Sequence, residues 1–168
     1  MKLIIATPSP FARKVRVILR EKAIHCEEII DVPWNKDTIT KGLNPLGKIP
    51  ILIKDGIEPI FDSKNIIKYL EQINPEPSFY PESRSKKLKA SLLETAADGI
   101  CDAVVLIFLE KSRSQNLRSK AWIDRQKEKI YTGTQYLSDN LLTNKYFVDD
   151  HFTIADVAAF CCLEYLDL

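Results

Sequence analysis

Ser9 stands at the point where a predicted strand meets a predicted helix, and such a junction suits an anion. The run at residues 2–6 is β-prone, and after a proline-containing breaker the apolar residues Phe11, Val15 and Ile18 recur with helical spacing. The first amides of a helix have no partner inside the helix, and the helix dipole adds partial positive charge there. Ser9 could therefore face a bound anion such as a thiolate.

The Ser9 hydroxyl has the chemistry to stabilise such a thiolate. A free thiol has a pKa of about 8.5, and a hydrogen bond together with a helix start can lower that pKa into the range of about 3.5 to 7.5. Lowering the thiol pKa by one requires about 1.4 kcal/mol of preferential stabilisation of the thiolate, which one charge-assisted hydrogen bond can supply. In this interpretation Ser9 activates the sulfur of a bound molecule and is not itself the nucleophile. The alternative is that Ser9 is a plain helix cap.

The elements that position Ser9 follow the order β-α-β-α-β-β-α. Pro50 opens the third strand, and Asp55 with Gly56 gives a turn signal within a hairpin. Ser63 is the expected cap of the third helix. The apolar face expected for that helix comprises Ile66, Ile67, Leu70 and Ile73. The expected ranges are strands at 2–6, 26–32 and 49–53, a short polar helix or loop at 36–43, and a hairpin over 51–61.

A proline-rich linker at residues 77–84 separates this α/β domain, residues 1–76, from an all-α domain at residues 85–168. Long helical periodicity replaces the mixed pattern in the second half. The face expected to be apolar at the start of its first helix comprises Leu88, Leu92, Ala96 and Gly99.

The last predicted helix begins with a capping-box pattern at Thr153 and Asp156. We expect both residues to be structural, because a cap stabilises a helix by about 1 kcal/mol and needs no ligand to explain it. The apolar stretch at residues 154–166 is interrupted by two acidic residues and falls short of the ~20 residues that a membrane-spanning helix needs.

The overall composition is that of an ordinary soluble protein, with 45% hydrophobic and 28% charged residues. A formal net charge of +1 creates no field that attracts nucleic acid or an acidic membrane surface. The apolar run at the amino terminus is too brief for a signal peptide, so a cytoplasmic protein is expected. The basic residues Arg13, Lys14 and Arg16 are expected to form a solvated helix face.

The cysteines indicate neither a disulfide framework nor a metal site. They form no CxxC pair, and the chain has only two histidines. We expect the thiols to be reduced and mostly buried. The residues concerned are Cys26, Cys101, Cys161 and Cys162, with His25 and His151.

Four segments in series carry a family resemblance. They are SPFARKVR at residues 9–16, NPLGKIP at 44–50, FDS at 61–63 and FTIAD at 152–156. In this order the chain resembles a cytosolic glutathione S-transferase of the bacterial type that has serine at the thiol-activating position. The resemblance implies a thioredoxin-like first domain that binds glutathione as a co-substrate, with no tightly bound cofactor. It also implies addition of the glutathione thiolate to a small electrophile, with Ser9 stabilising the thiolate.

The resemblance further implies which residues bind glutathione. Ile49 precedes Pro50 in a cis peptide bond, and its backbone pairs with the cysteinyl backbone of glutathione. Ser63 and the amides near it hold the γ-glutamyl carboxylate, and Asp62 lies near the ammonium group. Lys36 is aimed at the glycyl carboxylate, although Trp34 and Lys48 could serve nearby. The local alternatives are a strand-opening proline at Pro50 and an ordinary helix cap at Asp62 and Ser63.

Two rival functions fit the same fold. Thiol-disulfide exchange needs a cysteine where this chain has Ser9, and no other cysteine falls in that turn. A non-catalytic interaction protein, similar to the stringent starvation proteins that bind RNA polymerase, needs no such residue. Family members continue past the helix in which this chain stops, so the chain is either truncated or an abbreviated member. They are also usually homodimers, which is the state expected here.

Overall fold

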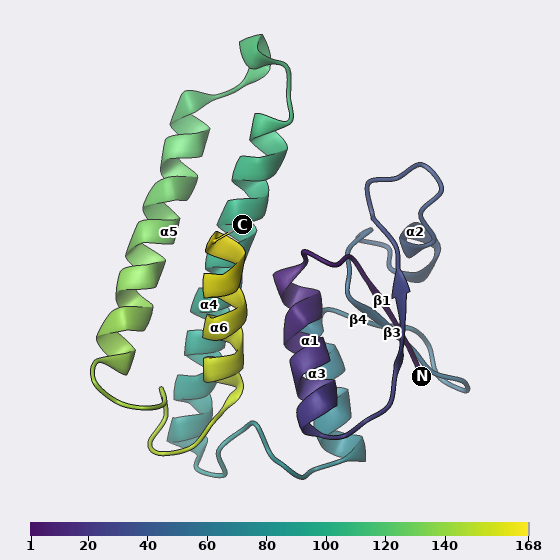
Figure 1. Ribbon diagram of the computed structural model, residues 1–168, viewed down its shortest axis with the longest axis vertical. Coiled ribbons are helices and arrows are strands. Elements are labelled where there is room, and N and C mark those ends of the chain that lie inside the picture. The colour runs from purple at the N-terminus through teal and green to yellow at the C-terminus, as the bar shows by residue number, and fades with distance from the viewer. Residues whose placement is uncertain (168) are drawn as a thin grey trace. The chain divides into compact units, whose positions relative to one another are not determined.

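The computed structural model describes residues 1–167 and has two compact units, Met1–Ser78 and Phe79–Leu168. The first unit contains a four-stranded mixed sheet in the order β2-β1-β3-β4. Its elements are β1 (Lys2–Ile5), α1 (Pro10–Glu21), β2 (Glu27–Ile30), α2 (Thr40–Leu43), β3 (Ile51–Ile53), β4 (Ile60–Phe61) and α3 (Ser63–Ile73) (Figure 1). This is the thioredoxin-like order that the sequence predicts.

The core of the first unit forms where α1 and α3 pack against each other and α3 packs on the sheet. Each helix buries one apolar stripe, and the buried residues of α3 are Ile66, Ile67 and Leu70. Ile73, expected on the same stripe, is the last residue of α3 and is 42% exposed. The buried strand and α1 residues are Leu3, Ile4, Ile51, Leu52, Val15, Ile18 and Leu19.

A buried lysine joins the ends of the two helices. The Lys22 ammonium group donates to the carbonyl oxygens of Asn74 at 2.8 Å and Pro77 at 2.7 Å, and it pairs with Glu71 at 2.8 Å. Asn74 donates in return to the Lys22 carbonyl at 3.0 Å. The bonds between Lys22 and Asn74 satisfy carbonyl groups at the two helix ends, and the bond to Pro77 holds the segment that follows α3.

The second unit consists of helices. Its elements are α4 (Arg84–Lys111), the short 3-10 helix η1 (Gln115–Leu117), α5 (Lys120–Leu141) and α6 (Ile154–Leu166). α4 packs against both α5 and α6. The capping box of α6 is present: Thr153 accepts from helix amides, and Asp156 accepts from the Thr153 amide at 2.8 Å. Within residues 1–167, no helix is long and apolar enough to cross a membrane.

The predicted apolar face of α4 is wrong at the start of the helix. Leu88 and Leu92 are 60% and 52% exposed. The buried stripe instead contains Ala90, Leu93, Ala97 and Ile100. Both sets recur at the spacing of a helix face, so periodicity alone could not choose between them. The packing of α4 against two other helices decides which stripe is buried.

Candidate functional site

The register of the sheet brings three predicted site segments to one end of the sheet. Ile4 pairs with Ile51, and Ile51 pairs with Phe61. Because β3 is antiparallel to both neighbours, the end of β1, the start of β3 and the end of β4 lie side by side. The predicted site residues that follow or precede these strand ends are Ser9, Ile49, Pro50, Asp62 and Ser63.

Ser9 is the N-cap of α1. Its Oγ atom accepts a hydrogen bond from the Ala12 amide at 3.2 Å, and its backbone amide donates to the Ala6 carbonyl at 3.0 Å. A hydroxyl has one donor hydrogen and two acceptor lone pairs, so the cap does not consume its O–H group. No acceptor for that hydrogen is found in residues 1–167. The cap and the predicted role toward a thiolate are therefore compatible.

Ile49 presents an unused stretch of backbone beside β1. Its bond to Pro50 is cis, as the family resemblance implies. In the part of the chain that the structure describes, neither the amide nor the carbonyl of Ile49 has a hydrogen-bond partner. Ile49 is half-buried and Pro50 is buried. The Ile49 amide can donate one hydrogen bond to a bound molecule, and the Ile49 carbonyl can accept one from it.

The start of α3 corrects one prediction, because its N-cap is Asp62 and not Ser63. Asp62 accepts from the Lys64 amide at 2.8 Å, and its φ of 70° lies where residues other than glycine are uncommon. Ser63 is the first helical residue and is only 4% exposed. Within the described residues its amide and hydroxyl make no hydrogen bond. Ser63 thus offers two donors at a helix start.

The segment that carries Lys36 is held by Asp31. This carboxylate accepts from the Thr38 hydroxyl at 2.6 Å and from the hydroxyl and amide of Thr40 at 2.5 and 3.0 Å. Burial raises the pKa of Asp31, but the hydrogen bonds from Thr38 and Thr40 outweigh it, so the pKa lies below its ordinary value. The Asp31 amide donates to Ile5 at 2.8 Å, which starts the segment at the same end of the sheet.

The side chains that the resemblance offers for the glycyl carboxylate all lie at the surface. Lys36 is exposed, as are the two alternatives Trp34 and Lys48.

The basic stripe expected on α1 is only partly solvated. Lys14 is 1% exposed, so it is not a solvated residue, and Arg16 pairs with Glu28 at 2.8 Å. A buried ammonium group needs partners that replace water, and a sequence pattern does not reveal them. Sequence reasoning also gave no role to Asp31 or to Asn44, a buried residue before β3.

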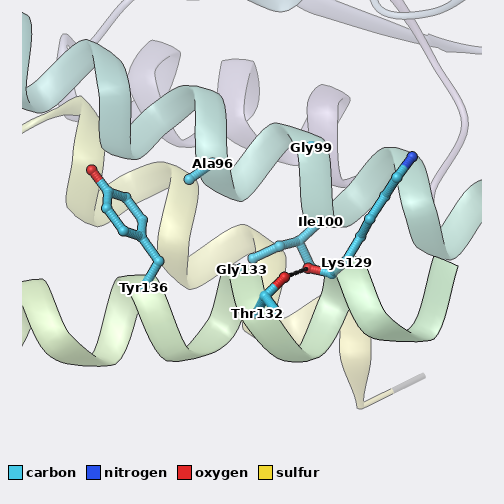
Figure 2. A pocket seen from close by; sticks show the side chains of 7 residues that line it. All are labelled: Ala96, Gly99, Ile100, Lys129, Thr132, Gly133 and Tyr136. Carbon is cyan, nitrogen blue, oxygen red and sulfur yellow. Dashed lines mark hydrogen bonds between the residues drawn. The ribbon is translucent and has the colours of Figure 1, made fainter. Parts of the chain in front are cut away.

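A cavity of about 340 Å³ lies elsewhere, between α4 and α5 of the helical unit. Its lining comprises Ala96, Gly99, Ile100, Lys129, Thr132, Gly133 and Tyr136 (Figure 2). The Thr132 hydroxyl donates to backbone carbonyls of its own helix, at 2.9 Å to Glu128. The lining contains no carboxylate, histidine or cysteine beside its lysine, threonine and tyrosine, and the helix starts of the first unit are the candidate site.

Comparison with known proteins identifies the family. Residues 8–73 match the glutathione S-transferase N-terminal domain, and residues 96–167 match the glutathione S-transferase C-terminal domain. The chain belongs to the glutathione S-transferase family.

Individual relatives agree with this assignment. The uncharacterized GST-like protein YibF of Escherichia coli is 35% identical over 99% of this chain and 82% of its own length. A glutathione S-transferase of Methylobacterium radiotolerans, solved with glutathione sulfonate, is 40% identical with a TM-score of 0.96, over 99% of this chain and 79% of that one. One from Methylobacillus flagellatus, solved with glutathione bound, is 34% identical with a TM-score of 0.94, over 99% and 82%.

Other relatives differ in length or in name. This chain spans 64% of two Nicotiana tabacum relatives that are 30% identical to it. A stringent starvation protein A homolog of Histophilus somni is 27% identical over 93% of this chain and 70% of its own length.

Proposed function

We propose that this protein binds glutathione and adds its thiolate to a small electrophile. The observation that carries the proposal is the set of unused hydrogen-bonding groups on Ser9, Ile49 and Ser63 at one end of the sheet. These groups come from three separate segments, and each lies at a helix start or beside a strand end. Two relatives at 34% and 40% identity were solved with glutathione or its sulfonate, which supports the same ligand here.

Each part of the tripeptide has a partner in this proposal. The Ser63 amide and hydroxyl bind the γ-glutamyl carboxylate at the start of α3, where the helix dipole favours an anion. The exposed Asp62 carboxylate lies near the ammonium group of the γ-glutamyl residue. The Ile49 amide and carbonyl, next to Pro50, pair with the cysteinyl backbone. Lys36 is the proposed partner of the glycyl carboxylate.

Ser9 acts on the sulfur. Its O–H group donates to the thiolate while its oxygen keeps the cap of α1, and the thiol proton leaves to solvent. The thiolate then forms a carbon–sulfur bond to the electrophile as a leaving group departs or a strained ring opens. Most of the rate comes from holding the two reactants in place. The proposal includes a homodimeric state, and it names no particular electrophile.

Glutathione titration by calorimetry tests the binding step, and a panel of halide and epoxide acceptors tests the reaction. The proposal predicts saturable binding of glutathione to the whole chain and glutathione-dependent turnover of at least one acceptor. Absence of binding at millimolar glutathione would contradict it. Light scattering tests the homodimer, and a monomer would contradict that part alone.

A second candidate is a non-catalytic interaction protein, which the similarity to a stringent starvation protein A homolog favours. A glutathione-affinity column separates the two. Retention with release by free glutathione supports the transferase, and passage without retention favours the interaction protein.

A further inference from the structure

Asn44 lies in the loop before β3 and is almost completely enclosed, with 2% of its surface exposed. It ends α2, and its backbone amide donates to the Thr40 carbonyl at 2.9 Å. Its own carbonyl accepts from the Gly47 amide at 2.9 Å, which closes a tight turn in which Gly47 has a φ of 60°. The backbone of Asn44 is thus held in place before its side chain is considered.

Both ends of the Asn44 side chain bond to this same loop. The Nδ2 group donates to the Lys48 carbonyl at 2.7 Å, and the Oδ1 atom accepts from the Leu46 amide at 2.9 Å. A carboxamide can donate from its nitrogen and accept at its oxygen without carrying a charge. Exchange for aspartate keeps the shape but removes the donor toward Lys48.

The bond to Lys48 determines the direction of the next amide. The Lys48–Ile49 peptide bond is trans, since the cis bonds of the described chain are at Pro50 and Pro77. In a trans peptide the carbonyl and the N–H group lie in one plane and point in opposite directions. With the Lys48 carbonyl turned toward Asn44, the Ile49 amide hydrogen is directed away from Asn44. That amide has no partner in residues 1–167.

We infer that Asn44 is a positioning residue that orients the Ile49 amide toward the cysteinyl carbonyl of glutathione. This inference rests on the proposed function, and Asn44 itself touches no substrate. Its side chain sets the peptide plane that the ligand contacts. Loss of the side-chain donor frees that plane to rotate and weakens the hydrogen bond to the ligand.

The test compares Asn44→Asp with the unaltered protein, using two ligands in titration calorimetry. One ligand is glutathione, and the other is a glutathione analogue in which a methylene group replaces the cysteinyl carbonyl. The variant should bind glutathione about tenfold more weakly, the effect of one hydrogen bond to a preformed site, and should bind the analogue with less than a twofold change. Asn140→Asp is the matched control, because Asn140 also donates to a backbone carbonyl, that of Tyr136 at 2.8 Å in α5. It should change neither affinity.

The ratio of the two affinities keeps the test valid if the variant is less stable. Both ligands bind the same folded fraction of the protein. Partial unfolding therefore lowers both apparent affinities by the same factor and leaves their ratio unchanged. Asn44→Ser, which keeps a shorter donor, should give an intermediate ratio. Equal weakening of both ligands, or no weakening, overturns the role of Asn44 while leaving the proposed function intact. Failure of the unaltered chain to bind glutathione overturns the proposed function first, and the inference with it.

Discussion

Glu110 accepts a hydrogen bond from the Ser119 amide at 2.7 Å and thereby joins the end of α4 to the start of α5. Arg113 lies 3.2 Å from the same carboxylate. The bond from Ser119 lowers the pKa of Glu110, burial raises it, and Arg113 lowers it further, so the pKa lies below its ordinary value. The side chain ties two helices that the chain connects through the short 3-10 helix η1.

The first prediction concerns pH. Because the folded pKa of Glu110 is below the unfolded value of about 4.3, the carboxylate stabilises the folded protein above that pH. This contribution disappears as the pH falls through the folded pKa. Glu110→Gln should therefore lower the urea midpoint at pH 7 and have a smaller effect at pH 3.5. A difference that is the same at both pH values would contradict the role of the charge.

The second prediction separates the two roles of Ser9. Ser9→Ala should lose about 1 kcal/mol of stability through the cap and, beyond that, most of the turnover, while glutathione affinity is largely kept. Ser119→Ala is the matched control, since Ser119 caps α5 by accepting from the Trp122 amide at 3.2 Å. It should cost a similar stability and leave turnover per folded molecule unchanged. Thermal unfolding and steady-state kinetics on both variants provide the comparison, and equal turnover in the two refutes the role toward sulfur.

The third prediction concerns Asp31. Removal of its carboxylate leaves the hydroxyls of Thr38 and Thr40 without their acceptor, while the Thr40 amide keeps a bond of 3.2 Å to the Thr38 hydroxyl oxygen. Asp31→Ala should destabilise the protein by about 1–3 kcal/mol at pH 7. Since the folded pKa of Asp31 is lowered, the stability of the unaltered protein should approach that of the variant as the pH falls below about 3.9. Denaturant unfolding over this pH range measures the difference, and a constant gap would argue against it.

The fourth prediction uses two glycines within helices. A Cβ atom at Gly133 would lie 2.6 Å from Cγ1 of the buried Ile100, whereas one at Gly99 would have no atom within 4 Å. Gly133→Ala should destabilise the helical unit by about 1–3 kcal/mol from overpacking, less the gain in helix propensity. Gly99→Ala should stabilise it by up to about 1 kcal/mol. Denaturation midpoints measure both effects, and a shift of the same sign in both variants would show that close packing at Gly133 is unimportant.

Much of the site follows from local sequence because helix starts and turns are governed by near neighbours. Ser9 caps α1 in the structure as its sequence context suggests, and the cis bond at Pro50 agrees with the resemblance. The third helix starts one residue earlier than expected, because Asp62 and not Ser63 provides the cap. Both residue types can cap a helix, so sequence could not decide between adjacent candidates.

What the sequence determined by itself is the order of elements, the caps at Ser9 and Thr153, and the family. These depend on periodicity, on capping chemistry and on short motifs. Only the tertiary structure decided that Leu93 and not Leu92 is buried, that Lys14 is enclosed, and that Asn44 holds the Lys48 carbonyl. It also decided the register that brings Ser9, Ile49 and Ser63 to one end of the sheet. These features depend on contacts between residues distant in the chain, and a single sequence records what each residue can do but not which distant partner it meets.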